Sequence, residues 1–277
     1  MALIRKLINM AAIPFTKPLR REYESLFNSC IVRPERVPTI EKIISNLNEN
    51  KSRYQAVSGL QGVPWSFVAV IHNMESSLNF SKHLHNGDPL TIRTVQVPSG
   101  RPRKGTPPFT WEESAADALS LKGLSSTTDW SLAGTLYQLE RYNGWGYRLY
   151  HQHVLSPYLW GYSTNYVTGK YVSDGTWSDT AVSGQCGSAV LLRRMAESGL
   201  IEFQDQPAPQ PNTPPLVVSY AMKKSADPSV VRRVEELQRW LNTFPGIFVK
   251  PDGVPGDKTS EAYKKVTGSY LPGDGRG

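Results

Sequence analysis

A proline-rich stretch near residue 210 sets the strongest limit on how this chain can fold. Residues 206–215 read QPAPQPNTPP, so half of these positions lack a backbone N–H. Proline also locks φ, so the stretch can form neither the interior of a helix nor a central strand. We expect a semi-extended linker over residues 203–225. The segments on either side each carry a complete apolar pattern, which predicts two separately folded parts.

The apolar spacing predicts a mainly α (α+β) chain. It indicates an irregular N-terminal extension over residues 1–38, one larger domain over 39–202, and a small helical domain over 226–277. Apolar residues at helical spacing predict helices. They are expected over residues 39–58, 65–77, 110–121, 132–142, 188–198 and 229–242. Thr110 and Glu113 form a capping-box pattern at the start of one of them. Residues 78–109 are turn-rich and are expected to form a small β-lobe.

The net charge of the chain indicates which classes of binding partner it favours. The formal net charge is +7 in 277 residues, which favours polyanions such as bacterial wall polymers. The Lys and Arg residues are scattered rather than striped, and no nucleic-acid-binding motif is present, so we expect no nucleic-acid partner. No apolar stretch approaches the length of a membrane span. The first residues are too broken by charge and Asn9 for a clear signal peptide, so they are interpreted as a short amphipathic helix.

The stretch from Trp65 to Ser77 predicts an apolar helix that ends in a carboxylate, Glu75. A carboxyl at the end of a buried helix lies at the edge of the core, where partial desolvation raises its pKa. Cleavage of a glycosidic bond needs such an acid, because the leaving oxygen must be protonated. A plain solvated carboxylate at a helix end is the alternative.

Downstream of this helix, the chain supplies a second carboxylate and two hydroxyls. Asn86-Gly87 is a tight-turn signal, and Asp88, Thr91 and Thr94 follow it. The order Glu75, Asp88, Thr94 resembles the lysozyme superfamily, in which a helix-end Glu precedes an Asp and a Thr in a small β-lobe. The interval from Glu75 to Asp88 is longer than in phage-type lysozymes. The Glu75-Ser76 pair also resembles goose-type lysozymes and lytic transglycosylases.

The C-terminal segment carries a pattern of its own. An amphipathic helix around Leu237 is followed by Asp252-Gly253, Gly256 and Thr259, and then by a second helix. The glycines permit tight turns, and Thr259 is expected to cap the second helix. The pattern resembles the small helical peptidoglycan-binding domain. That resemblance implies that Asp252, Gly253, Gly256 and Thr259 belong to the wall-binding element.

Residues 142–177 are rich in Tyr and Trp among Gly, Asn and Ser. Such rings can stack on sugar faces while their polar groups bond hydroxyls, although some must serve as core plugs. We expect a mixture of the two. The segment resembles the lower lobe of lysozyme-like folds, in which aromatic residues and an Asn or Gln line the groove, and this resemblance implies substrate binding by Tyr142, Asn143, Tyr158 and Tyr166. The earlier segment adds Thr91 and His85 to the predicted substrate-binding residues.

The sequence offers only weaker patterns for a metal site or for a catalytic nucleophile. The pairs His83/His85 and His151/His153 offer metal ligands, but neither is a recognised helix-borne set, so we expect no metal and no cofactor. No Gly-x-Ser-x-Gly nucleophile motif occurs. Cys30 and Cys186 can pair in an oxidising compartment or lie buried as thiols.

The resemblances together imply a monomeric peptidoglycan hydrolase of the muramidase (endolysin) type. Its bond would be that between N-acetylmuramic acid and N-acetylglucosamine, with Glu75 as the acid and Asp88 and Thr94 holding the water. A lytic transglycosylase using Glu75 alone and a non-enzymatic wall-binding protein are the alternatives. A wall hydrolase without an export signal fits a phage endolysin, passing from the host cytoplasm to the periplasm or wall, or a protein secreted by another route.

Overall fold

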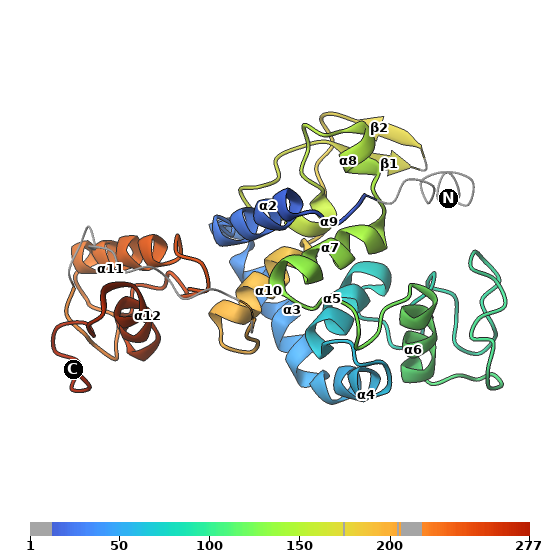
Figure 1. Cartoon of the computed structure of the whole chain (residues 1–277), viewed down its shortest axis with the longest axis horizontal. Helices are drawn as coiled ribbons and strands as arrows, with labels where there is room; N and C mark the ends of the chain where they lie inside the picture. The colour runs from blue at the N-terminus through green and yellow to red at the C-terminus, as the bar shows by residue number, and fades with distance from the viewer. Residues whose placement is uncertain (1–12, 174, 204, 206–217) are drawn as a thin grey trace. The chain divides into compact units, whose positions relative to one another are not determined.

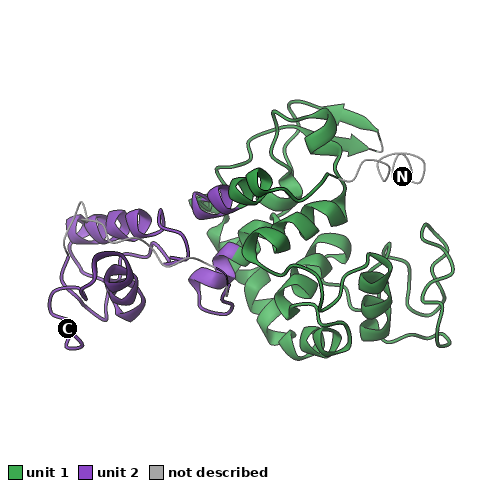
Figure 2. Ribbon diagram, viewed as in Figure 1, with its two compact units in different colours: residues 1–23, 31–192 green, residues 24–30, 193–277 purple. Residues whose placement is uncertain are grey.

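The computed structural model describes residues 13–173, 175–203, 205 and 218–277. This part of the chain is mainly helical, as expected, with one small two-stranded sheet (Figure 1). It divides into two compact units (Figure 2). Unit 1 comprises residues 1–23 and 31–192, and unit 2 comprises residues 24–30 and 193–277. The division falls inside two helices, α2 (Lys17–Asn28) and α10 (Ser188–Glu197).

Unit 1 is built around a buried helix, α5 (Trp65–Ser76). Phe67, Val68 and Ile71 are fully buried along it, and its apolar residues occur on every side. Each such side chain contributes about 1.5–3 kcal/mol of burial free energy. The unit also contains the helices α3 (Val37–Glu49), α4 (Lys51–Gln61), α6 (Trp111–Leu121), α7 (Leu132–Asn143), α8 (Gly146–Tyr150) and α9 (Pro157–Trp160), and the short 3₁₀ turn η1 (Pro34–Arg36).

The single helix expected over residues 39–58 is two helices. Asn50 leaves the helical conformation at φ −96° and ψ 12°, and its side chain donates to the carbonyl of Asn46 at 2.9 Å. Asparagine competes with the helical backbone through such local bonds, which explains the break. The second helix then runs on to Gln61, and the left-handed Gly62 ends it.

The capping box at Thr110 is confirmed. The Thr110 side chain accepts from the Glu113 N–H at 3.2 Å, and the Glu113 carboxylate accepts from the Thr110 N–H at 2.9 Å. Both bonds satisfy backbone donors that the first turn of a helix leaves free. The helix ends at Leu121, as the sequence predicts.

The β-lobe expected over residues 78–109 is wrong. Within this described segment the only strand pairing is an isolated bridge between Lys82 and Pro89. Prolines lack the N–H group that would bond a neighbouring strand. Several backbone N–H groups in this segment donate to side-chain oxygens instead of to a partner strand. The sheet forms instead from β1 (Lys170–Ser173) and β2 (Thr176–Ser178), in which Tyr171 pairs with Trp177.

Aromatic packing anchors this small sheet in unit 1. The Trp177 ring stacks on His151 with centroids 3.4 Å apart, and Tyr147 meets both Tyr171 and Trp177 edge-on. A two-stranded sheet is only marginally stable alone, so these ring contacts supply the support it needs.

Unit 2 contains the helices α11 (Pro228–Leu241) and α12 (Asp257–Thr267). They enclose a small core of their own, formed by Val218, Val234, Leu237, Leu241, Ile247, Val249, Ala262, Tyr263, Val266 and Leu271. The amphipathic stripe read from the sequence therefore forms the contact between these helices. The end of α10 lies in the same unit, where Arg193 donates to the Phe27 carbonyl at 2.9 Å and pairs with Glu197.

Three further predictions concern the N-terminal segment, membrane-spanning helices and the two cysteines. The segment 1–38 is not irregular throughout, because α2 occupies residues 17–28; the amphipathic helix expected at the start lies outside the described residues. No helix in the described residues combines the length and apolar character needed to cross a membrane. Cys30 and Cys186 are both buried free thiols.

Candidate functional site

Glu75 lies at the C-terminal end of α5, where the chain leaves the core. Met74 and Ser76 on either side of it are buried, whereas Glu75 is half-buried. The helix is closed by Ser77 at φ 51° and Leu78 at φ 61°. A left-handed conformation is unfavourable for a branched side chain such as leucine, so the surrounding structure must impose it. The turn therefore brings the carboxylate to the surface at a defined place.

The helix α9 supplies a partner for this carboxylate. The Tyr158 hydroxyl donates a hydrogen bond to Glu75 Oε1 at 2.9 Å, across 83 residues of sequence. The backbone of Tyr158 is also held in place, because the Ser188 hydroxyl at the start of α10 donates to the Tyr158 carbonyl at 2.9 Å. The structure thus joins Tyr158, a predicted substrate-binding residue, to Glu75 by a hydrogen bond.

Residues 184–188 form hydrogen bonds with α5 and with the residue that follows α9. The Gln185 side chain donates to the Met74 carbonyl at 2.9 Å, and Gly187 N–H donates to the Gly161 carbonyl at 2.9 Å. A Cβ at Gly187 would lie 2.1 Å from the Leu159 carbonyl oxygen. Only glycine permits this backbone approach, so Gly187 sets how closely the segment packs on α9.

We therefore expect Gly187→Ala to destabilise the protein by about 1–3 kcal/mol, the usual cost of overpacking. The backbone of α9 must move, and Tyr158 must move with it, so the hydrogen bond from Tyr158 to Glu75 should weaken too. Thermal unfolding measures the first effect. Gly184→Ala is the matched control, because a Cβ there meets nothing within 4 Å. Equal melting temperatures for the two variants would contradict this packing argument.

Asp88 occupies a different setting from Glu75. Its Oδ2 accepts hydrogen bonds from the N–H groups of Val95 at 2.8 Å and Gln96 at 3.0 Å, and from the Asn86 amide at 3.0 Å. Burial works against ionisation, but these three donors outweigh it, so the pKa of Asp88 lies below its ordinary value. Asp88 is thus an anion that fastens residues 95–96 to the turn at residues 86–88.

The two threonines of the predicted set also differ. Thr94 is buried; its hydroxyl donates to the Pro98 carbonyl and accepts from the Arg101 N–H at 2.9 Å. Both bonds engage the Thr94 hydroxyl within its own loop. The prediction that Thr94 holds the attacking water is therefore not supported. Thr91 is exposed.

The two histidines of this segment lie in the interior. His83 bonds Ser114 at 2.7 Å and the Ile92 carbonyl at 2.8 Å. His85 is bonded to Asp117 at 2.8 Å, and burial lowers its pKa despite that partner. His85 therefore secures the loop to α6 rather than presenting a nitrogen to substrate. Within the described residues, no three His, Cys, Asp or Glu side chains form a group that could hold a metal ion.

Of the three predicted aromatic residues, Tyr166 is buried, and Tyr142 and Tyr158 are half-buried. Tyr166 is only 3% exposed, and its hydroxyl donates to the Gly169 carbonyl at 3.2 Å and accepts from Ser183 N–H at 3.0 Å. It offers a glycan no free ring face, so the prediction that it binds substrate is not supported. Tyr142 is half-buried beneath Lys122, and Asn143 is exposed at the end of α7.

The predicted wall-binding residues of unit 2 surround a buried amide, Gln238. Its Nε2 donates to Asp252 Oδ1 at 3.0 Å and contacts Thr259 Oγ1 at 3.1 Å, while its Oε1 accepts from Gly253 N–H at 3.0 Å. Thr259 does not cap α12, because the helix begins at Asp257 and its N-cap residue is Gly256. Thus Asp252, Gly253 and Thr259 hold the loop to α11 from inside.

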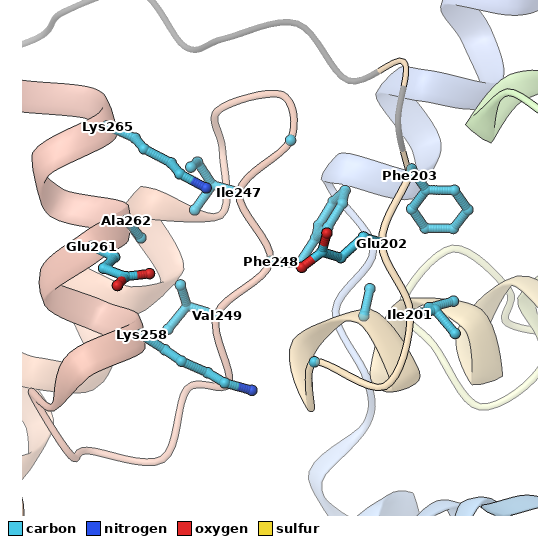
Figure 3. Close-up of a pocket in the computed structure, with 13 residues that line it drawn as sticks. Ile201, Glu202, Phe203, Ile247, Phe248, Val249, Lys258, Glu261, Ala262 and Lys265 are labelled. Carbon is cyan, nitrogen blue, oxygen red and sulfur yellow. The ribbon is translucent and has the colours of Figure 1, made fainter.

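A pocket of about 540 Å³ lies elsewhere in unit 2 (Figure 3). Its wall from α12 carries Lys258, Glu261 and Lys265, and apolar side chains such as Ile247 and Phe248 complete it. A second pocket, of about 660 Å³ in unit 1, is lined by Glu140, Arg148, Ser156 and Trp160 among others. Glu75 lines neither. The case for Glu75 therefore rests on its place at the end of α5 and its bond to Tyr158.

Three residues important to these sites were not singled out from the sequence as site residues. Gln185 and Gly187 support the Glu75 region, and Gln238 organises the loop of unit 2. A buried glutamine on the apolar stripe of α11 could have signalled Gln238, because a buried amide needs partners. Nothing local marks Gln185 or Gly187, since their partners are far away in sequence.

Comparisons with family models, with curated proteins and with solved structures gave no match to this chain.

Proposed function

We propose that this protein is a lysozyme-like peptidoglycan hydrolase that cleaves the bond between N-acetylmuramic acid and N-acetylglucosamine. The observation that carries the proposal is the half-buried Glu75 carboxylate at the end of a buried helix, bonded to the Tyr158 hydroxyl. The sequence resemblance of Glu75, Asp88 and Thr94 to the lysozyme superfamily supports the same reaction.

In this reaction Glu75 protonates the glycosidic oxygen as the bond to the sugar breaks. A hydroxyl donor at 2.9 Å restricts the rotation of the carboxylate and so helps to position it. Positioning matters because a general acid must lie within hydrogen-bond reach of the atom it protonates. In the hydrolytic version, Asp88 holds the attacking water on the opposite face of the sugar. No cofactor or metal takes part.

A lytic transglycosylase is the second candidate, and one observation favours it. Asp88 Oδ2 and the Thr94 hydroxyl are both engaged in bonds within their own loop. A transglycosylase needs neither residue, because the 6-hydroxyl of muramic acid takes the place of water and Glu75 serves as both acid and base.

Mass spectrometry of digested peptidoglycan tests the proposal. Reducing muramic ends are expected for the hydrolase, and 1,6-anhydro ends would establish the transglycosylase instead. Free peptides would indicate an amidase or peptidase, and the absence of products from folded protein would leave a wall-binding protein. The last two outcomes contradict the proposed reaction.

Unit 2 is proposed to hold the enzyme on the insoluble wall, which raises the local concentration of substrate. We expect residues 218–277, which contain the whole core around Val234 and Val266, to co-sediment with purified sacculi without lysing them. Binding should persist at raised salt, where attraction between exposed charges is screened. Glu236→Gln, on an exposed position of α11, serves as the control for charge. A folded fragment that stays in the supernatant would show that the module does not bind the wall.

A further inference from the structure

The loop of residues 91–105 carries exposed apolar side chains that have no role in the proposed hydrolase reaction. Three branched aliphatic side chains stand out from it: Ile92 is 45% exposed, Val95 70% and Val97 61%. In Figure 1 this loop extends from the helices of unit 1 beside α6. Soluble proteins seldom gather such side chains on one exposed segment unless something binds there.

The loop is held in shape by its own hydrogen bonds. Asp88 Oδ2 fixes the N–H groups of Val95 and Gln96, and the Thr94 N–H donates to the Arg101 carbonyl at 2.8 Å. Arg101 in turn pairs with Asp117 of α6 at 3.4 Å. A segment ordered before it binds loses less conformational entropy on binding, so Val95 and Val97 are presented ready for contact.

The same loop is strongly basic. Residues 91–105 include Arg93, Arg101, Arg103 and Lys104 and contain no Asp or Glu. Arg93 donates to the Gly105 carbonyl at 2.6 Å and Arg101 pairs with Asp117. Arg103 and Lys104 are exposed, and neither forms an ion pair within the described residues. Two cations that form no ion pair in the described part of the chain thus lie within ten residues of the exposed valines.

We propose that the 91–105 loop docks on an anionic lipid surface, with Val95 and Val97 entering the interface and Arg103 and Lys104 contacting lipid phosphates. The combination of aliphatic and basic groups is what such a surface binds. The loop has no aromatic ring to stack on a sugar or a base, which disfavours a glycan strand or nucleic acid as the occupant. This inference does not depend on the reaction at Glu75.

The first test is co-sedimentation of the full chain with vesicles. Binding is expected to vesicles of phosphatidylglycerol and phosphatidylethanolamine, and not to phosphatidylcholine alone. Each basic residue near an anionic surface is worth about fivefold in affinity, so Arg103→Gln/Lys104→Gln should weaken binding by ~25-fold. Val95→Ser/Val97→Ser should weaken it at least about tenfold through lost apolar burial. Circular dichroism confirms that the variants are folded.

Matched controls separate the loop from the general surface. Val167→Ser/Val182→Ser removes two comparably exposed valines elsewhere in unit 1, and Arg21→Gln/Lys42→Gln removes two exposed cations. Neither pair should change vesicle binding more than about twofold. Cleavage of soluble muropeptide chains, where present, should be the same in the valine loop variant and the unaltered protein. Equal loss of binding in the loop variants and the controls would overturn the proposal.

A second measurement reports insertion directly. Val97→Cys can be labelled with a polarity-sensitive dye, because Cys30 and Cys186 are buried. Anionic vesicles should shift its emission to the blue, and soluble polyanions such as heparin should not. A dye that stays in water while the protein sediments would mean adhesion by charge alone, and the proposal would then be wrong. A labelled position 182 provides the control site.

Discussion

Replacing Glu75 by glutamine is expected to lower peptidoglycan cleavage by ~10²–10⁴-fold, the usual contribution of a general acid. Glutamine keeps the shape of the side chain and its carbonyl can still accept from Tyr158, but it carries no transferable proton. Because the bond to Tyr158 can persist, the fold should remain intact. Release of soluble muropeptides from purified sacculi measures the rate, and circular dichroism with thermal unfolding checks the structure.

The matched control is Glu49→Gln. Glu49 is the last residue of α3, so it is also a carboxylate at a helix end, and it is exposed. We expect this variant to keep full activity. A Glu75→Gln enzyme that is equally active would remove the assignment of Glu75 as the acid, and the proposed mechanism with it.

The second large effect is expected at a buried ion pair in unit 1. Glu140 is 4% exposed; it accepts from Arg148 Nε at 2.7 Å and from the Tyr23 hydroxyl. Arg148→Met should lower the free energy of unfolding by about 3–5 kcal/mol at neutral pH, because it leaves a buried carboxylate without its cation. Chemical denaturation measures the change. Arg239→Met, which breaks a partly exposed pair with Glu235, should cost no more than about 1 kcal/mol.

The effect of Arg148→Met should depend on pH. Burial raises the pKa of Glu140 above its ordinary value, with Arg148 and Tyr23 acting in the opposite direction. A carboxyl whose pKa is raised by folding contributes stability at low pH that is lost as the pH rises through the folded pKa. Without Arg148 that pKa rises further, so the deficit should be small near pH 4 and larger near pH 8.

A double variant checks the cause of that loss. Arg148→Met/Glu140→Gln removes both charges of this buried pair, so it should recover part of the stability and lose the added pH dependence. A deficit that is the same at pH 4 and pH 8 would show that packing around Arg148, rather than the charge of Glu140, accounts for the loss.

The sequence by itself determined the local elements of this protein. The helical spacing of apolar residues predicted α5, with Glu75 near its end, and the amphipathic stripe of α11, and the residue types at Thr110 and Glu113 predicted the capping box. Each of these depends on residues three or four positions apart, and their interactions are the same in any fold that contains the helix. The sequence predicted a single helix where the structure has α3 and α4, because the Asn50 side chain donates to the Asn46 carbonyl and interrupts the helix.

Only the tertiary structure decided what most of the candidate side chains do. Asp88, Thr94 and His85 carry the right functional groups, but their partners at Gln96, Pro98 and Asp117 engage them in holding a loop. Glu75 meets Tyr158 across 83 residues, and Gly187 meets Leu159 through the backbone. Hydrogen bonds and close contacts between distant segments form only after the chain has packed. For that reason the type and spacing of residues marked Glu75 as a candidate, whereas its surroundings could be known only from the fold.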